Sequence, residues 1–236
     1  MLQVKNLTVT HRKDLRCLIK DFSWTLRPGD KAVIIGEEGN GKSTFLKLLY
    51  DKNLVEDYVE YSGEIIKDHC RIGYLPQEMP KDCMEMTVLQ YFEQFPMFYD
   101  CEWGMLARTA GILGFPPDFY YWSKQVGKMS GGEKVKLSLA RMMLMEPELL
   151  LLDEPSNDID IHTLQWLERF INTCQIPVVF ISHDETLIEN TANVIIHFEQ
   201  LRRKTVFRGT VARVDYRSYV RFRLVFIFDQ DIYERQ

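Results

Sequence analysis

The chain has 236 residues, of which 46% are hydrophobic and 27% are charged, a balance that excludes a disordered or fibrous protein. This length is enough for one large α/β domain or two small ones with a real core. No apolar run approaches the ~20 residues that cross a bilayer, and the first residues have no signal-peptide core. The five cysteines are scattered without the pair spacing of a metal site. This pattern predicts reduced thiols in a cytoplasm.

The formal net charge of −5 gives no overall attraction to nucleic acid. The basic segment 201–223 is the exception, because it contains a single acid, Asp215. Such a run is usually a solvated face, and contact with RNA or phosphate is the alternative. Its basic residues are Arg202, Arg203, Lys204, Arg208, Arg213, Arg217, Arg221 and Arg223.

The first third of the chain alternates short apolar strands with turns, and its N-terminal strands are expected to be antiparallel. The strand 31–36 is β-branched and ends on glycine, as buried parallel strands do. A helix is predicted over 42–50, where apolar residues recur at helical spacing. The predicted strands in this part are 2–9, 22–26, 31–36 and 71–76.

The middle of the chain changes character. Residues 87–128 are rich in aromatic residues and methionine at helical spacing, which predicts a helical subdomain. Strands and helices alternate again after it, a pattern that predicts a mainly parallel sheet with helices on its faces. The predicted elements of this part are helices at 133–144 and 160–174 and strands at 149–153, 177–182 and 194–198.

The segment GEEGNGKST lies between a predicted strand and a predicted helix, the setting of a phosphate-binding P-loop. Its glycines let successive N–H groups point at phosphate oxygens, and the helix N-terminus adds positive potential. Lys42 is expected to reach the β- and γ-phosphates, and the Ser43 hydroxyl to bind Mg²⁺. The predicted nucleotide-binding residues are Gly36, Glu37, Glu38, Gly39, Asn40, Gly41, Lys42, Ser43 and Thr44.

Two adjacent carboxylates follow the apolar run 149–152. Asp153 ends a buried strand, where a carboxylate can hold Mg²⁺ directly or through water. Glu154 lies past the strand end, where it can orient or deprotonate a water opposite the leaving group. The alternative for Glu154 is an exposed carboxylate at the start of a helix. A second carboxylate beside the metal-binding one favours hydrolysis over transfer to a substrate.

The segment MSGGEKVKLSLAR begins a helix and has two interpretations. Ser130 followed by Glu133 three residues later is a capping box. Capping does not explain Gly131 and Gly132, each of which costs about 1 kcal/mol against alanine in a helix. Two adjacent glycines therefore predict that something approaches the backbone closely, such as a second anion at this helix N-terminus.

Five motifs together resemble an ATP-binding cassette (ABC) ATPase: GEEGNGKST, YLPQE, MSGGEKVKLSLARMML, LLLLDEP and ISHD occur in that family's order. The resemblance implies that the chain is a single nucleotide-binding domain over 1–236. Its ATP-binding core would be 1–86 and 145–210, and its helical subdomain with the signature motif 87–144. The tail 211–236 would start a linker between cassettes.

The resemblance also implies roles for further residues. Gln77 matches the glutamine that contacts Mg²⁺ and the attacking water, and His183 matches the switch histidine that bonds the γ-phosphate. Ser130, Gly131, Gly132 and Glu133 match the signature motif, which contacts the nucleotide of the opposite cassette. Asp160 ends the D-loop at the cassette interface. His11 falls where the family usually has an adenine-stacking tyrosine.

The stretch DEPSNDID is most similar to the soluble twin-cassette ABC-F branch. It keeps a hydroxyl residue at Ser156, then Asn157 and the closing Asp160, although Asp158 and Ile159 replace the branch's histidine and leucine. Tyr216 and Tyr219 resemble the start of the branch's linker helix. ABC-F proteins are roughly twice this length and act on ribosomes, in translation or antibiotic protection. The implied partners are a second cassette, beyond residue 236 or in a homodimer, and ribosomal RNA at 201–223.

Two other functions stay open at this stage. The chain could be the energy-coupling subunit of a membrane transporter, with the aromatic helical subdomain forming the groove for a membrane partner. It could also be an ATP-gated binding module with vestigial hydrolysis, although intact Glu154 and His183 argue against this. The aromatic residues concerned are Tyr91, Phe92, Phe95, Phe98 and Tyr99.

Overall fold

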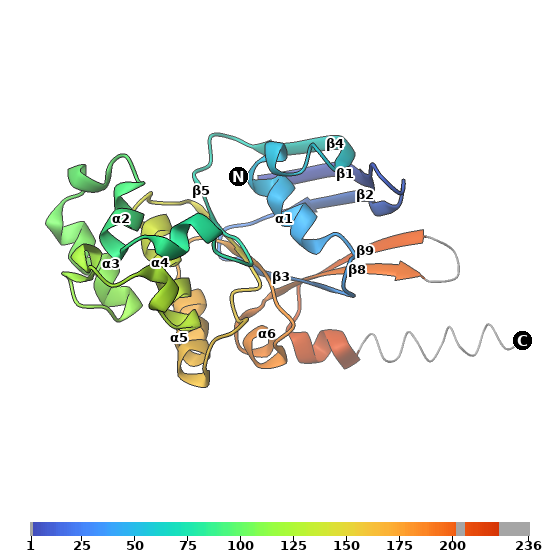
Figure 1. Ribbon diagram of the computed structural model, residues 1–236. Helices are drawn as coiled ribbons and strands as arrows, with labels where there is room; N and C mark the ends of the chain where they lie inside the picture. Colours follow the sequence, from blue (N-terminus) through green and yellow to red (C-terminus); the bar gives the residue numbers. More distant parts are fainter. Residues whose placement is uncertain (1, 202–205, 222–236) are drawn as a thin grey trace, which may run out of the picture.

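The structure is a computed structural model that describes residues 2–201 and 206–221, in which two sheets and a helical subdomain are arranged around the central strands (Figure 1). A three-stranded antiparallel sheet has the order β2-β1-β4, and a six-stranded sheet has the order β5-β6-β7-β3-β8-β9. The strands of the first sheet are β1 (Leu2–His11), β2 (Cys17–Thr25) and β4 (Val59–Lys67). The second contains β3 (Lys31–Gly36), β5 (Ile72–Leu75), β6 (Leu149–Asp153), β7 (Val178–Ile181), β8 (Val194–Leu201) and β9 (Val206–Ala212).

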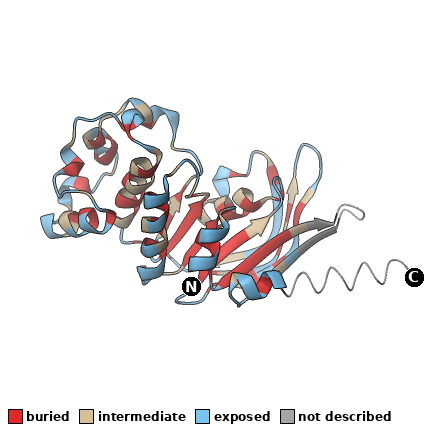
Figure 2. Ribbon diagram, turned by 90° about the horizontal axis from the view of Figure 1, so that it is seen from below, coloured by how far each residue is buried: buried red, intermediate tan, exposed pale blue. Residues whose placement is uncertain are grey.

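The six-stranded sheet is parallel from β5 to β8, and only β9 runs antiparallel to its neighbour. Its central strands are buried on both faces, which is why they read as continuous apolar runs. Successive residues alternate between two cores: Leu150 and Leu152 face one, and Leu149 and Leu151 face the other. Figure 2 shows this burial along the strands, with exposed positions on the outer faces of the helices. The predicted α/β fold with a mainly parallel sheet is confirmed.

Six α-helices are described in residues 2–201. The helix α1 follows the P-loop, α2 to α4 lie in the helical subdomain inserted between β5 and β6, and α5 and α6 follow β6 and β7. The predicted bounds of α1 match those observed, and those of α4 and α5 differ by one or two residues, as expected at frayed ends. The helices are α1 (Lys42–Tyr50), α2 (Val88–Glu93), α3 (Trp103–Leu113), α4 (Gly131–Met143), α5 (Ile161–Thr173) and α6 (Glu185–Thr191).

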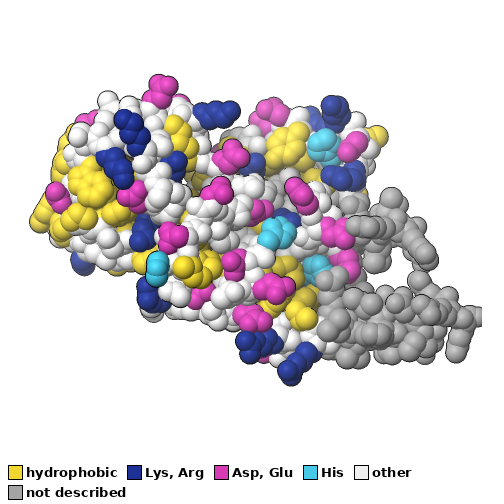
Figure 3. All heavy atoms as spheres, turned by 60° about the horizontal axis from the view of Figure 1, so that its bottom comes forward, with side chains coloured by type: hydrophobic (Ala, Val, Ile, Leu, Met, Phe, Trp, Pro, Cys, Tyr) yellow, Lys and Arg dark blue, Asp and Glu magenta, His cyan; other side chains and the backbone are white. Residues whose placement is uncertain are grey.

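The helical subdomain is built around Phe92, which is fully buried. Its ring lies 4.7 Å from that of Tyr120 and 5.6 Å from those of Phe98 and Phe119. Packing within the subdomain therefore accounts for most of the aromatic residues that could have formed a groove for a membrane partner. Tyr99 is the exception, at 69% exposure. Hydrophobic side chains gather on this end of the molecule (Figure 3), and the exposed ones are Met97, Tyr99, Trp103, Ile112 and Tyr121.

The basic segment 201–223 is partly neutralised by the chain itself. Arg213 makes two hydrogen bonds to Asp30, at 2.6 and 3.0 Å. Arg217 pairs with Glu189 at 3.0 Å. Residues 202–205 and 222–236, which contain four of the eight basic residues, lie outside the described part. Two of the arginines proposed to contact RNA are therefore already engaged in intramolecular ion pairs.

The C-terminal helical turn after β9 is fixed to the core. Asp215 accepts a hydrogen bond from the backbone N–H of Ser218, which caps this turn. The Tyr219 hydroxyl lies 2.8 Å from Nδ1 of His197, and both residues are buried. This part of the predicted tail 211–236 therefore packs against the core as far as residue 221.

Candidate nucleotide site

The P-loop connects β3 to α1 and passes close to the end of β8. A Cβ atom on Gly36 would lie 2.2 Å from the carbonyl oxygen of Phe198, so only glycine fits there. The side-chain amide of the buried Asn40 donates to the same carbonyl oxygen at 3.2 Å. The Asn40 side chain therefore holds the loop against β8. Its predicted contact with phosphate would use its backbone N–H group.

Lys42 lies under the P-loop, where it is almost fully buried. Its ammonium donates to the carbonyl oxygens of Gly36 at 2.8 Å and Glu37 at 3.0 Å. Burial lowers the pKa of Lys42, and the nearby carboxylates of Glu154, Glu38 and Asp153 oppose that shift. Among the described residues this ammonium bonds to neutral carbonyl oxygens, which it is well placed to exchange for the charged oxygens of a phosphate.

Asp153 is 1% exposed and accepts hydrogen bonds from two hydroxyl groups. Ser43 donates to Oδ1 at 2.9 Å, and Tyr74 donates to Oδ2 at 3.4 Å. Burial raises the pKa of Asp153, against the effect of the Ser43 hydrogen bond. A cation at these oxygens would relieve that cost, and hydroxyl and carboxylate oxygens are the donors that Mg²⁺ prefers. The residues present therefore fit a magnesium ion.

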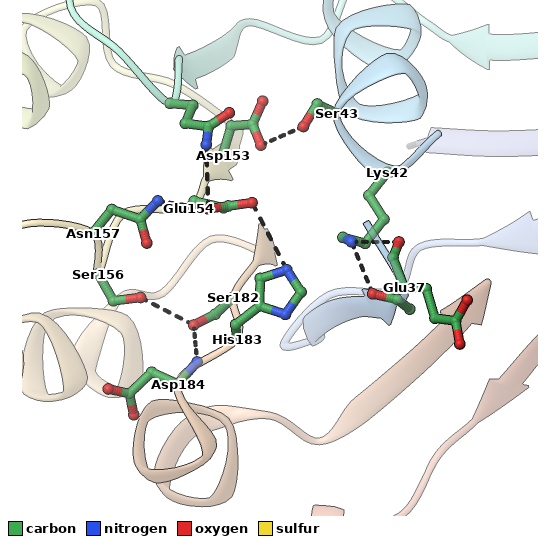
Figure 4. A network of polar contacts seen from close by, with 12 residues as sticks. Glu37, Lys42, Ser43, Asp153, Glu154, Ser156, Asn157, Ser182, His183 and Asp184 are labelled. Atoms are coloured by element: carbon green, nitrogen blue, oxygen red, sulfur yellow. Dashed lines mark hydrogen bonds and ion pairs between the residues drawn. The ribbon is translucent and has the colours of Figure 1, made fainter. Parts of the chain in front are cut away.

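Glu154 is the centre of a polar network (Figure 4). Oε2 accepts from the side-chain amides of Gln77 at 3.3 Å and Asn157 at 2.5 Å. The other carboxylate oxygen, Oε1, lies 3.9 Å from Nε2 of His183. The structure thus brings together the three residues that the sequence predicted as catalytic. The Gln77 amide group contacts Glu154 and not Asp153, so its predicted contact with a metal would use the amide oxygen.

A second pair of hydrogen bonds joins the loop after Glu154 to the loop that carries His183. The Ser156 and Ser182 hydroxyl oxygens are 3.0 Å apart, and the Ser182 hydroxyl also accepts from the backbone N–H of Asp184 at 3.0 Å. These contacts connect the carboxyl ends of β6 and β7, which are neighbours in the sheet. The relative position of Glu154 and His183 is fixed by them.

A cavity of about 640 Å³ is lined by Gln77, Glu154 and His183 and reaches the end of β1. His11 lies at its far end with Nδ1 2.8 Å from Oδ1 of Asp14, and its ring is 6.3 Å from that of Tyr58. Arg16 also lines the cavity and donates to the carbonyl oxygen of Gly39 at 3.2 Å. Sequence reasoning found His11 but missed Tyr58 and Arg16. Strand pairing brings Tyr58 there, because His11 is opposite Val59 in the sheet.

The predicted capping box at the start of α4 is present. Ser130 accepts from the Glu133 backbone N–H, and Glu133 accepts from that of Ser130. The chain's own residues approach both glycines closely: the loop after β6 at Gly131 and helix α5 at Gly132. A Cβ on Gly131 would lie 2.1 Å from the carbonyl oxygen of Asp158, and one on Gly132 would lie 2.5 Å from Oγ1 of Thr163.

The signature segment and the D-loop occupy a different region from the P-loop cavity. Among described residues, the lining of that cavity contains none of 130–133. Asp160 caps α5 by accepting from the backbone N–H groups of His162 and Thr163. The hydroxyl of Thr163 also donates to Asp160 and lowers its pKa. Each of these residues has a structural role within the chain, which leaves their predicted contact with a partner's nucleotide as an expectation.

Replacing Glu133 with glutamine tests the electrostatics of this helix start. Burial opposes ionisation of Glu133, but the Ser130 backbone N–H and the Lys124 ammonium lower its pKa below the usual 4.5. The carboxylate therefore stabilises the fold above pH 4.5, and this is lost as pH falls through the lower folded pKa. Glu133→Gln is expected to cost up to about 0.5 kcal/mol at neutral pH and nothing in acid. Thermal unfolding across this range measures the difference, and a gap that persists in acid would contradict the assignment.

A family model described as ABC transporter matches residues 19–157, more than half of the chain. The chain belongs to the ABC ATPase family. This cassette is 34% identical over 187 residues to the ATP-binding protein Uup of Escherichia coli K12, an alignment that covers 77% of this chain. It is 33% identical to Uup of Haemophilus influenzae over 78% of the chain. The energy-dependent translational throttle protein EttA of Escherichia coli K12 is 30% identical over 78% of the chain.

These relatives are much longer than the cassette: the alignments span 28% of each Uup protein and 39% of EttA. Two solved structures share the fold. A metal-chelate type ABC transporter gives a TM-score of 0.67 at 22% identity, covering 89% of this chain and 82% of its own. A dimeric ATP-binding cassette with bound ADP and phosphate gives 0.64 at 20% identity, covering 84% and 94%. No helix of the cassette's described residues is long and apolar enough to cross a membrane.

Proposed function

We propose that the cassette binds Mg-ATP and hydrolyses it to ADP and phosphate at a composite site formed by head-to-tail pairing with a second cassette. The observation that carries the hydrolytic part is the contact of Glu154 with Gln77, together with its approach to His183, at the edge of the P-loop cavity. A magnesium ion held by Ser43, Asp153 and Gln77 would neutralise charge on the phosphates. A solved cassette of this fold is dimeric, which supports the pairing.

Each catalytic residue has a distinct proposed role. The backbone N–H groups of 36–44 and the Lys42 ammonium bind the phosphates. Glu154 accepts a proton from the attacking water, and Gln77 orients that water. His183 donates a hydrogen bond to the γ-phosphate. These groups stabilise the transition state by position and charge, which is the main route to catalysis in phosphoryl transfer.

The remaining predicted residues contact a nucleotide away from the catalytic residues, either in this cassette or in its partner. Ser130 to Glu133 contact the γ-phosphate of the partner cassette, and Asp160 lies along the interface. His11 contacts adenine, with the aromatic ring of Tyr58 beside it. A chain that holds half of each composite site should turn over slowly at concentrations too low for pairing.

We further propose that this cassette is part of an ABC-F-type protein that acts on the ribosome, in translation or in protection against antibiotics. The supporting observation is that three relatives match over 77 to 78% of this chain, and one of them is named for an effect on translation. The loop 156–160 supports it because Ser156, Asn157 and Asp160 match the ABC-F pattern.

The native polypeptide that contains this cassette provides the test. Its Glu154→Gln variant, with the equivalent change in any second cassette, should co-sediment with ribosomes when ATP is added. A matched control adds Lys42→Ala to the same protein, which should remove ATP binding and with it the co-sedimentation. Sedimentation that does not depend on ATP, or its absence, would contradict the ribosomal role. Co-purification of a multi-span membrane protein would instead favour the energy-coupling subunit of a transporter.

A further inference from the structure

Glu154 has a backbone conformation that most residues avoid. Its φ of 50° lies in the left-handed region, which is uncommon for a residue with a side chain. The turn is closed by the backbone N–H of Asn157, which donates to the carbonyl oxygen of Glu154 at 3.2 Å. Such conformations persist where surrounding contacts fix them, and they concentrate at functional sites. The position of this carboxylate therefore depends on the loop that follows it.

The side chain of Asn157 returns to Glu154 from that loop. Its amide donates to Oε2 at 2.5 Å, so the backbone and the side chain of one residue both bond to Glu154. Gln77 shares the same carboxylate oxygen at 3.3 Å. The other oxygen, Oε1, lies on the His183 side of the carboxylate, and both residues line the cavity. The two amides thus select which carboxylate oxygen is available to a water molecule.

Folding gives little reason for an asparagine at this position. The residue is exposed, and neither core cluster contains it. Its loop is held by other contacts, namely the Ser156–Ser182 hydroxyl pair and the packing of the Asp158 carbonyl oxygen against Gly131. An amide can donate to a carboxylate without adding charge, whereas an aspartate there would repel it.

We propose that Asn157 is a positioning residue for ATP hydrolysis: its side-chain amide holds Oε2 of Glu154 so that Oε1 faces the attacking water. This inference rests on the proposed role of Glu154 as the base. Asn157 contacts neither nucleotide nor metal in this scheme. Its removal therefore lowers the rate of the chemical step and leaves nucleotide binding unchanged.

Steady-state ATP hydrolysis by the full chain, at a concentration high enough for pairing, tests the proposal. Asn157→Ala is expected to lower kcat about tenfold, the effect of 1.4 kcal/mol on the barrier, with KM for Mg-ATP within about twofold of the parent. The matched control is Asn172→Ala, which removes an exposed asparagine that donates to the Asn190 carbonyl oxygen far from the site. That control should keep the parent kcat.

A double variant distinguishes positioning from a general loss of structure. Asn157→Ala should have no further effect when Glu154 is already glutamine. A general loss of structure would instead lower the residual rate of the Glu154→Gln protein as well.

Two outcomes would overturn the inference. The first is a parent kcat in Asn157→Ala, and the second is a fall in kcat matched by a fall in thermal stability or ATP affinity. The Glu154→Gln variant separates this inference from the proposal on which it rests. If Glu154→Gln keeps the parent rate, the base assignment fails. If it is inactive while Asn157→Ala is unchanged, only the positioning role fails.

Discussion

Glu154→Gln is expected to lower ATP turnover at least about 100-fold, because general base catalysis contributes about 10² to 10⁴. Glutamine has the same shape as glutamate, and its amide oxygen can still accept from Asn157 and Gln77. What it loses is the ability to take a proton from water. Mg-ATP binding through the P-loop and Asp153 should persist, so the variant should accumulate the ATP-bound, paired form.

Phosphate release and retention of labelled ATP measure the two halves of this prediction. Glu56→Gln is the matched control, since Glu56 is an exposed carboxylate in a loop outside the site and should keep the parent rate. A Glu154→Gln variant that keeps more than a tenth of the parent turnover would assign proton transfer to another group. A variant that loses ATP binding would mean that Glu154 serves mainly to hold the loop.

The central sheet and the P-loop were predictable because their signals are local. A strand buried on both faces must be apolar along its central residues, and 32–35 and 149–152 are. Strand β4 was missed for the converse reason. All of its residues from 60 to 64 are exposed, and its pairing with β1 is irregular between Lys5 and Thr8. No alternating apolar face therefore marks this strand in the sequence.

The same distinction applies to the candidate site. The motif residues were found because each lies beside its own strand end, and the parallel sheet brings those ends to one edge. Tyr58 was missed because it reaches the cavity through the pairing of β1 with β4, across 47 residues of chain from His11. Asn157 was noted only as a family feature, since its contact with Glu154 depends on the left-handed turn at that residue.

The glycines of the signature segment were located correctly but given an incomplete reason, and Gly131→Ala separates the two explanations. The added Cβ would lie 2.1 Å from the Asp158 carbonyl oxygen, so the loop 156–160 must move. Overpacking of this kind costs about 1 to 3 kcal/mol. Because that loop carries Asn157, turnover should also fall by at least about tenfold.

Unfolding of the nucleotide-free protein decides between a contact within the chain and one with a partner's nucleotide. Gly111→Ala in α3 is the control, since a Cβ there meets nothing within 4 Å. Alanine should stabilise that helix by up to about 1 kcal/mol. If Gly131→Ala loses stability without nucleotide, the glycine is needed for the D-loop to pack. If it keeps its stability but loses turnover, the glycine serves the opposite cassette, because a clash within the chain would act in both states.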